Sequence, residues 1–244
     1  MRFIEWFPHY QEIRQQFHYS TEKDQEAANL LSRLIKRKAL DLKKIENKIV
    51  GRRVIVIGAG PGLGSNINFI KKDRKSVKIA ADDTVRALIE NKITPDIVLT
   101  DLDGDISFLR KADKMGSIMV VHAHGDNIDA LKRMVPTLRH VIGSTQVMPV
   151  NNVYNFGGFT DGDRCVFLAD ELGAKEIIMV GMELSDDIGK YSKTPIEDFE
   201  LKKQKLKKGK RLLQLLAKHS NSMLFDTSEK PVKGFAHFLI PKDN

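Results

Sequence analysis

Residues 97–105 read Ile-Val-Leu-Thr-Asp-Leu-Asp-Gly-Asp, an apolar run that ends abruptly in Asp101, Asp103 and Asp105. A short apolar run bounded by turn residues is typical of a buried strand. Three neighbouring carboxylates repel one another and raise each other's pKa unless a cation or a proton relieves them. Hard oxygen ligands of this kind suit magnesium, manganese or calcium. The segment therefore predicts a metal site at the end of a strand, with helix capping or a solvated turn as the alternative.

The same pattern recurs after Gly51, where short apolar runs are each followed by glycine or an acid and then by a helix-like stretch. This pattern is the signature of strand-helix-strand units in a parallel sheet. We therefore expect an α/β fold, a Rossmann-like mostly parallel sheet with flanking helices over residues 51–244. Ligands bind such sheets beyond the carboxyl ends of the strands. The expected strands span 53–57, 77–80, 96–100, 117–121, 140–142, 176–180 and 223–225, with 235–240 as a further edge strand.

Residues 1–50 are expected to form an N-terminal helical segment appended to this α/β catalytic domain. Apolar residues recur at helical spacing over 26–50, which predicts one long amphipathic helix or two shorter ones. Residues 2–19 are rich in aromatic side chains, which we expect to pack into the core. Lining of a substrate pocket and a subunit interface, in a homo-oligomer, are the alternatives.

Composition narrows the functional classes. The chain has 244 residues, of which 41% are hydrophobic and 30% charged, as in soluble globular proteins. No apolar stretch approaches the roughly 20 residues of a membrane span, and no secretion signal is evident, so a cytoplasmic location without membrane contact is expected. Cys165 is the only cysteine, which excludes an internal disulfide.

The net charge of +8 favours anionic partners such as nucleotide phosphates. Basic residues concentrate over 202–211, where they predict a solvated helix face or one or two lysines over a phosphate-binding mouth. Nucleic acid is not an expected partner, because aromatic residues do not interleave with these lysines as they do in single-strand binders.

Candidate ligand contacts follow the first two expected strands. Gly58, Gly60 and Gly62 lie after the first strand, where glycines permit close approach of a phosphate to backbone N–H groups at a helix start. Close packing of strand and helix without a ligand is the alternative. The spacing is not the dinucleotide fingerprint, because Leu63 occupies the place of the third glycine. Asp82 follows the second strand and could bind a ribose or cap the next helix.

Further candidates follow the later strands. Residues 122–127 read His-Ala-His-Gly-Asp-Asn, and alternation places His122 and His124 on the same side, where two imidazoles could ligate a metal. Residues 157–164 read Gly-Gly-Phe-Thr-Asp-Gly-Asp-Arg, a glycine-rich loop whose acids could act in catalysis or cap a helix. Glu183 follows the strand at 176–180 and is expected at the same carboxyl edge of the sheet.

These motifs occur in the order found in one family. Gly-Ala-Gly-Pro-Gly-Leu, Ala-Ala-Asp, Asp-Leu-Asp-Gly-Asp, His-Ala-His-Gly-Asp-Asn, Gly-Phe-Thr-Asp-Gly-Asp-Arg and Val-Gly-Met-Glu resemble the archaeal 6-hydroxymethyl-7,8-dihydropterin pyrophosphokinase family over residues 50–185. The similarity to the thiamine pyrophosphokinase catalytic domain is more distant. The resemblance implies magnesium-dependent transfer of diphosphate from ATP to the hydroxymethyl group of a reduced pterin, releasing AMP, in methanopterin or folate-type cofactor biosynthesis.

The resemblance also implies roles for individual residues. Asp101 and Asp103 would be the principal magnesium ligands, with Asp105 as a further ligand or as a partner of the ligands. Asp83 stands where the family has glycine, and Glu183 where it often has aspartate. In-line diphosphate transfer needs charge neutralisation and a proton acceptor for the alcohol. The catalytic candidates are Asp101, Asp103, Asp126, Asp161 and Arg164, with Asp163 as a further proton acceptor. The ligand-binding candidates are Gly58, Gly60, Gly62, Asp82, His122, His124, Gly125, Asn127, Thr160 and Asp163.

Other protein classes fit fewer of these motifs. Asp101-Leu-Asp-Gly also resembles the opening motif of haloacid-dehalogenase-type phosphatases, but two expected strands precede it here. An EF-hand is excluded, because Ile106 stands where its loop requires glycine. An S-adenosylmethionine-dependent methyltransferase could use the glycine turn and Asp82, although it leaves the acids at 101–105 unexplained. A non-catalytic nucleotide- or RNA-binding protein is the remaining alternative.

Overall fold

The computed structural model describes residues 3–184 and 196–241, and it contains one nine-stranded sheet in which all neighbouring strands are parallel. The order across the sheet is β6-β5-β4-β3-β2-β1-β7-β8-β9. The strands are β1 (Arg53–Ile57), β2 (Val77–Ala81), β3 (Ile97–Thr100), β4 (Ile118–Ala123), β5 (Val141–Thr145), β6 (Val153–Tyr154), β7 (Glu176–Val180), β8 (Met223–Asp226) and β9 (Ala236–His237). The expected α/β fold is confirmed.

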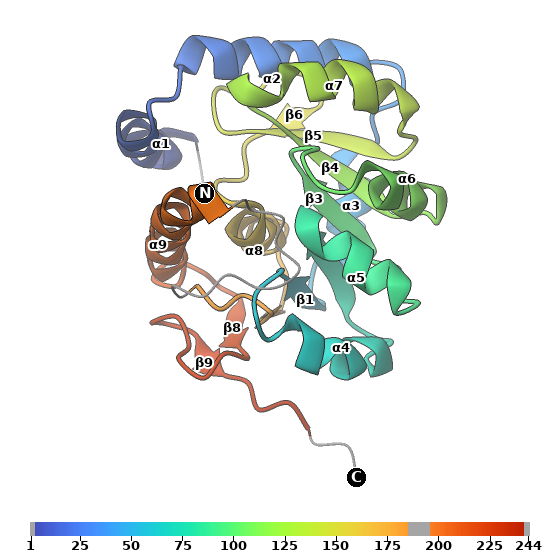
Figure 1. Cartoon of the computed structure of the whole chain (residues 1–244), viewed down its shortest axis with the longest axis vertical. Coiled ribbons are helices and arrows are strands. Elements are labelled where there is room, and N and C mark those ends of the chain that lie inside the picture. Colours follow the sequence, from blue (N-terminus) through green and yellow to red (C-terminus); the bar gives the residue numbers. More distant parts are fainter. Residues whose placement is uncertain (1–2, 185–195, 242–244) are drawn as a thin grey trace.

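Helices cover both faces of this sheet. In Figure 1, α4, α5 and α6 lie on one side of it and α8 and α9 on the other, while α2 and α7 lie near the β5–β6 end. The α-helices are α1 (Phe3–Phe17), α2 (Thr21–Ile35), α3 (Leu42–Ile49), α4 (Leu63–Lys72), α5 (Val85–Glu90), α6 (Ile106–Lys114), α7 (Ile128–Met134), α8 (Asp161–Glu171) and α9 (Phe199–Leu216). Short 3₁₀ helices are η1 (Asp82–Thr84), η2 (Gly125–Asn127), η3 (Val135–Thr137) and η4 (Ile196–Asp198).

Strand order explains where a ligand can bind. Strands β2 to β6 extend from one side of β1, and β7 to β9 extend from the other. The chain therefore reverses direction across the sheet between β1 and β7, and open α/β sheets bind ligands outside the carboxyl ends of the strands at such a switch point.

The expected strands are present, with one omission. The edge strand expected at 235–240 contains only the two residues of β9. Strand β6 was not predicted, because two residues after a turn carry no periodic signal.

The N-terminal residues form three helices. The region 26–50 divides into α2 and α3, because Asp41 caps the start of α3 by accepting a hydrogen bond from the backbone N–H of Lys43. The aromatic residues Trp6 and Tyr10 are fully buried, which confirms the expected core packing. Helix α2 contacts β4, β5 and β6, so residues 1–50 share the core of the sheet, and their division from 51–244 remains a prediction.

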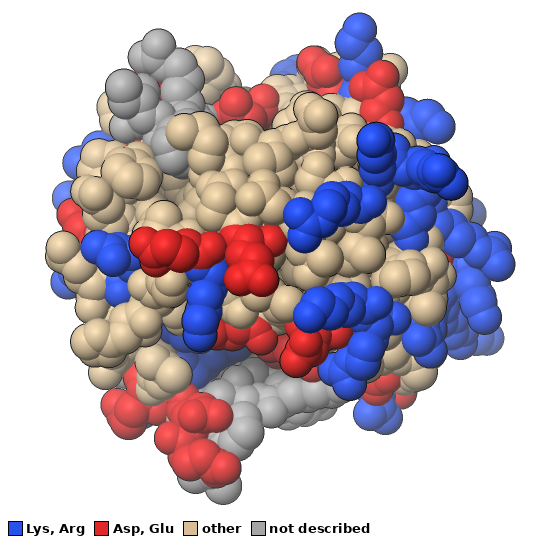
Figure 2. Space-filling view, turned by 90° about the horizontal axis from the view of Figure 1, so that it is seen from above, with Lys and Arg blue, Asp and Glu red and all other residues tan. Residues whose placement is uncertain are grey.

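The surface displays the many basic side chains that the net charge of +8 implies. Lys and Arg side chains gather on the right of the face shown in Figure 2, while Asp and Glu side chains lie near its middle. Across residues 3–184 and 196–241, no helix has both the length and the apolar character that a bilayer crossing requires. Cytoplasmic location and homo-oligomerisation remain predictions.

Candidate active site

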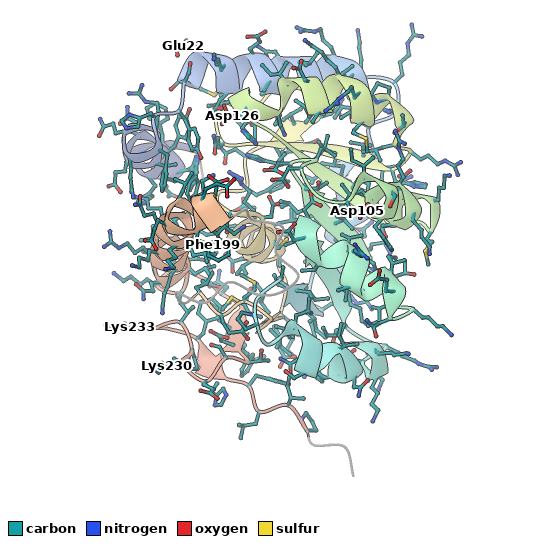
Figure 3. The ribbon with its side chains drawn as sticks, in the orientation of Figure 1. Glu22, Asp105, Asp126, Phe199, Lys230 and Lys233 are labelled. Atoms are coloured by element: carbon teal, nitrogen blue, oxygen red, sulfur yellow. The ribbon has the colours of Figure 1, made fainter. Side chains whose placement is uncertain are left out.

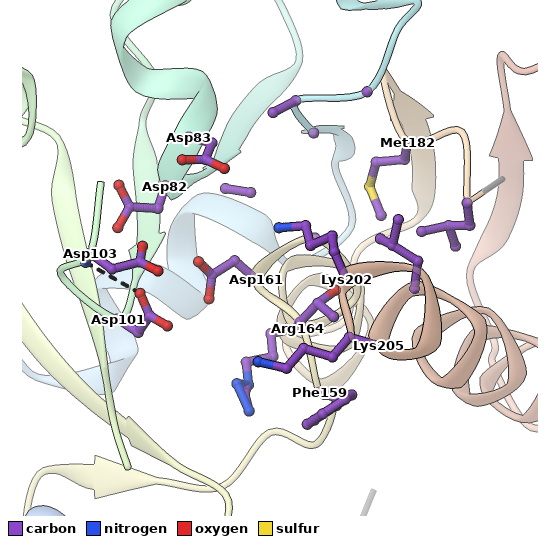
Figure 4. A pocket seen from close by; sticks show the side chains of 18 of the residues that line it. Asp82, Asp83, Asp101, Asp103, Phe159, Asp161, Arg164, Met182, Lys202 and Lys205 are labelled. Atoms are coloured by element: carbon purple, nitrogen blue, oxygen red, sulfur yellow. Dashed lines mark hydrogen bonds between the residues drawn. The ribbon is translucent and has the colours of Figure 1, made fainter. Parts of the chain in front are cut away.

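A cavity of about 440 Å³ opens at the switch point, where the carboxyl ends of six strands meet the start of α8 and one side of α9. Figure 4 shows aspartates on one side of this cavity, and Lys202 and Lys205 extending toward them from α9. The lining residues are Tyr19, Gly58, Ala59, Gly60, Ala81, Asp82, Asp83, Asp101, Asp103, His124, Gln146, Phe159, Thr160, Asp161, Gly162, Arg164, Gly181, Met182, Glu183, Leu184, Asp198, Leu201, Lys202, Lys205 and Leu206.

Three carboxylates form a compact group at the ends of β2 and β3. Asp82, Asp101 and Asp103 each place an oxygen within 4.8 Å of the other two. The sequence prediction had Asp105 in this group, and the structure corrects it. The Asp105 carboxylate instead caps α6 (Figure 3), accepting hydrogen bonds from the backbone N–H and the hydroxyl of Ser107. Asp82 takes the third position because β2 and β3 are neighbours.

The chain around the three acids is shaped to hold them together. Thr100, at the end of β3, donates its hydroxyl to Asp82 and accepts the backbone N–H of Leu102 at 2.8 Å. Leu102 has a φ of 71°, a left-handed conformation that costs a non-glycine residue on the order of 1 kcal/mol. A Cβ at Gly104 would lie 1.8 Å from Asp82 Oδ1, so only glycine allows the 101–105 turn to approach this carboxylate.

Near neutral pH this group of acids retains more protons than three ordinary carboxyl groups would. Burial raises the pKa of Asp82 to about 7. Burial and the charge of Asp101 raise the pKa of Asp103 to about 8, although part of its side chain faces the open cavity. Burial alone would raise the pKa of Asp101, but hydrogen bonds with His124 and Asp103 hold it below its usual range. The group therefore carries one firmly ionised carboxylate and two that retain protons near neutral pH.

These pKa values predict that the metal-free protein loses stability as pH rises. The folded protein holds protons that the unfolded chain releases near its ordinary pKa of 3.8, so this stabilisation is present at low pH and is lost through about pH 7 to 8. For chelator-treated protein we expect a Tm lower at pH 8.5 than at pH 6 by about 3 °C or more, equivalent to roughly 1 kcal/mol in a chain of this size. Thermal unfolding of wild type and Asp103→Asn provides the measurement. A Tm that rises over this range, or an equal slope in the variant, would contradict the assignment.

The residues present suit a divalent cation. Asp82 Oδ1 is buried without a hydrogen-bond partner among the described residues, beside two further carboxylates. An orphaned buried carboxylate oxygen is costly unless a ligand satisfies it. Oxygen-only ligands favour magnesium, manganese or calcium over zinc.

Positive charge faces the acids from α8 and α9. The Arg164 side chain is 5% exposed and lines the cavity. Burial lowers the pKa of this guanidinium, while Asp161, Asp163 and Asp101 oppose the shift. Burial and the charges of Asp101, Asp82 and Asp103 raise the pKa of Asp161 well above its ordinary value.

Helix α9 combines anchoring and cavity-lining lysines. Lys208 is buried, with Nζ 2.6 Å from Glu12 Oε2 on α1. A Cβ at Gly209 would lie 2.9 Å from Asp163 Oδ1, so glycine allows α9 to pack closely against the start of α8. Lys202 and Lys205 line the cavity one to two turns earlier, and phosphate binding by them remains a prediction.

The glycine turn after β1 differs from its predicted role. Gly58 and Gly60 line the cavity, but their N–H groups donate to the carbonyl oxygens of Val180 and Gly181 at 2.9 and 2.7 Å. The N–H of Gly62 donates to Glu183 Oε2 at 3.2 Å, and Gly62 lies outside the lining. These amides hold the ends of β1 and β7 together, so the structure does not support phosphate binding by their N–H groups.

The 122–127 motif contributes one cavity residue. His124 lines the cavity, with Nε2 3.5 Å from Asp101 Oδ2. His122 lies beside it with ring centroids 6.0 Å apart, but burial lowers its pKa well below the ordinary value and it does not reach the cavity. The Asn127 amide donates to the backbone oxygens of Asp101 and His122, both at 2.7 Å. Asn127 therefore connects β3 to β4, and neither Gly125 nor Asn127 lines the cavity.

Two predicted proton acceptors lie elsewhere. The Asp126 side chain is 70% exposed, outside the cavity lining (Figure 3). Asp163 is buried and caps α8, accepting the backbone N–H groups of Phe159 and Thr160 at 2.6 and 2.7 Å. Thr160 lines the cavity and shares this capping arrangement. Asp161 is the remaining candidate.

Sequence reasoning missed Gln146 and Phe159 as cavity residues, and it gave pocket lining by the aromatic residues 2–19, which include Tyr19, only as an alternative. Gln146 directly follows β5, so the rule that ligands bind beyond strand ends would have found it. Tyr19 and Phe159 come from loops, and the rings of Phe17 and Phe159 lie 5.0 Å apart. Only three-dimensional packing places these aromatic residues at the mouth.

Residues 26–189 match the family described as 6-hydroxymethylpterin diphosphokinase MptE-like. Proteins named 6-hydroxymethyl-7,8-dihydropterin pyrophosphokinase are similar to most of the chain. The Pyrococcus furiosus protein is 44% identical over 93% of this chain and 100% of its own length. The Methanocaldococcus jannaschii protein is 41% identical over 87% and 94%, and the Methanothermobacter thermautotrophicus protein 38% identical over 88% and 95%.

The fold also resembles a solved structure. A MAf glycosyltransferase from Magnetospirillum magneticum superposes with a TM-score of 0.53 over 78% of this chain and 34% of its own. The sequence identity is 15%, so this similarity concerns the fold alone.

Proposed function

The chain belongs to the 6-hydroxymethylpterin diphosphokinase MptE-like family, and on that premise we propose that it transfers diphosphate from ATP to 6-hydroxymethyl-7,8-dihydropterin. The products would be the pterin diphosphate and AMP, with magnesium required. The observation that carries the proposal is the pairing of three clustered carboxylates with Arg164, Lys202 and Lys205 across one cavity. Such a cavity can hold a polyphosphate and a metal ion between charges of both signs.

The reaction forms one bond and breaks one. The hydroxymethyl oxygen attacks the β-phosphorus of ATP, and the bond from that phosphorus to the α,β-bridging oxygen breaks. The bridging oxygen leaves with AMP, and the proton of the alcohol passes to a base. Little covalent chemistry is required of the protein, so positioning and charge stabilisation supply most of the catalysis.

Asp82, Asp101 and Asp103 are the residues proposed to hold magnesium. Bound there, the ion would neutralise charge on the phosphate oxygens. Arg164, Lys202 and Lys205 face the same space and would stabilise the negative charge that develops on the departing AMP.

Asp161 is the proposed proton acceptor. It lines the cavity at the start of α8, and its raised pKa gives it a higher proton affinity than an ordinary carboxylate. A base works best when its pKa lies near the operating pH. Asp126 and Asp163 lack this access.

The decisive assay mixes purified protein with magnesium, ATP and reduced hydroxymethylpterin. We expect AMP and pterin diphosphate in equal amounts, and no AMP when the pterin is omitted. Formation of ADP would indicate single-phosphoryl transfer and contradict the proposal. A methyltransferase, or a non-catalytic nucleotide- or RNA-binding protein, would give neither product, so the same assay separates these alternatives.

A further inference from the structure

A buried carboxylate outside the sheet connects the two charged sides of the cavity. Asp24, on α2, is 2% exposed and does not line the cavity. Its Oδ2 accepts the hydroxyl of Tyr10 at 2.8 Å and Nε2 of Gln146 at 2.7 Å. Its Oδ1 accepts the backbone N–H of Gly125 at 2.7 Å.

Gln146 carries this contact to the cavity. Its side-chain Oε1 accepts Nη2 of Arg164 at 2.9 Å, and its backbone oxygen accepts Nε1 of Trp6 at 2.8 Å. Gln146 is 4% exposed, so water cannot readily substitute for these bonds. The backbone and the amide of Gln146 are therefore both held by the N-terminal helices.

The polarity of the three groups fixes the amide in one orientation. A carboxylate offers only acceptors and a guanidinium only donors, whereas an amide has one end of each kind. Nε2 of Gln146 must therefore face Asp24, and Oε1 must face Arg164. Reversing the amide would place two donors against each other at Arg164 and two acceptors against each other at Asp24.

We propose that Asp24 is a positioning residue that acts through Gln146 to orient the Arg164 guanidinium in the cavity. Its second oxygen holds Gly125, the residue after His124, which contacts Asp101. Asp24 thus sets the cationic and the acidic side relative to each other. Its effect on catalysis rests on the proposed function, whereas the orientation of Arg164 does not.

Exchanging the carboxylate of Asp24 and the amide of Gln146 should restore the orientation of Arg164 that either single substitution removes. In Asp24→Asn, the new NH₂ group is a donor and faces either the Gly125 N–H or the NH₂ group of Gln146, which are donors too. If the Gln146 amide reverses to accept from Asn at position 24, its NH₂ group faces the Arg164 guanidinium, which is again a donor. In Asp24→Asn/Gln146→Glu, the new amide donates to a carboxylate that still accepts from Arg164, and the oxygen of that amide can accept the Gly125 N–H. The Tyr10 hydroxyl can rotate to donate to Thr21 Oγ1, 3.4 Å away.

We expect Asp24→Asn to lower kcat about 10- to 100-fold, the scale of a misplaced catalytic group, with a smaller change in KM. Gln146→Glu alone brings two carboxylates together and should also lower kcat. The double variant should recover to within a few-fold of wild type. Wild-type kcat in Asp24→Asn, or a double-variant loss equal to the product of the two single losses, would overturn the proposal.

Asp113→Asn is the matched control. Asp113 is also 2% exposed and accepts backbone N–H groups, those of Arg139 and His140, but it lies outside the cavity lining. We expect this variant to lose stability with little change in kcat. Equal kcat losses in Asp24→Asn and Asp113→Asn would show that Asp24 is structural only.

A second measurement is independent of turnover. The Arg164 Nε–H resonance, assigned by its loss in Arg164→Lys, should shift in Asp24→Asn and return in the double variant. If wild type makes no AMP but the resonance follows this pattern, the proposed function is wrong and the positioning role stands. If AMP forms but the resonance is the same in all variants, the positioning role is wrong.

Discussion

Asp101→Asn is expected to abolish diphosphate transfer while leaving the fold intact. Asp101 is the carboxylate of the group that stays ionised, because His124 and the Asp103 contact hold its pKa below the usual range. Removing one such preorganised charge costs on the order of 100-fold or more in rate. Asparagine keeps the shape of the side chain, so the variant should still fold. Because the ionised Asp101 is stabilised by His124 and by Asp103, we expect a Tm modestly below that of the wild type.

Asp105→Asn is the matched control for this prediction. Asp105 belongs to the same five-residue segment but caps α6, so its substitution should cost at most about 1 kcal/mol of stability and leave turnover nearly unchanged. Steady-state AMP formation and thermal unfolding of both variants provide the measurements. Near-normal turnover in Asp101→Asn, or equal losses in both variants, would refute the assignment of the acid group.

Arg164→Met is expected to lower kcat about 100-fold. The guanidinium is buried in the wall of the cavity and faces Asp161 and Asp101, so no solvent cation can replace it. Lysine is not an equivalent substitute, because it cannot reproduce the planar donor arrangement that meets Gln146. Arg164→Lys should therefore recover only part of the loss.

Arg110→Met controls for the loss of a positive charge. Arg110 is exposed on α6 and does not line the cavity, so its substitution should leave kcat unchanged. Comparison of kcat and KM for ATP in the three arginine variants provides the test. A loss in Arg164→Met that is confined to KM would show that the arginine binds ATP without stabilising the transition state.

The sequence predicted the sheet well because most strands are short, largely apolar runs, several of them with a glycine or acid directly after the last residue. Strand β7, for example, is Glu-Ile-Ile-Met-Val followed by Gly181. Strand β6 has only two residues and forms because β5 offers a free edge, which is a tertiary effect.

The site was less predictable, since its members meet across strands. Asp101 and Asp103 were identified from their own segment of sequence. Asp105 caps α6 and does not join them, and the pairing of β2 with β3 places Asp82 as the third acid of the group. The glycines after β1 matched a phosphate-binding pattern, yet their N–H groups donate hydrogen bonds to residues at and after the end of β7, over 100 residues later in the chain. Nothing in the sequence around Asp24 indicates that its carboxylate accepts a hydrogen bond from Gln146.

Asp82, Asp101 and Asp103 are proposed to hold a divalent cation against the phosphates of a bound nucleotide. Crystals grown with manganese and a non-hydrolysable ATP analogue test this directly through the anomalous signal of the metal. We expect a manganese peak among these three carboxylates, with phosphate oxygens bound to the same ion. A nucleotide bound elsewhere, or bound in the cavity with no metal at these carboxylates, would show that the three acids do not form the metal site.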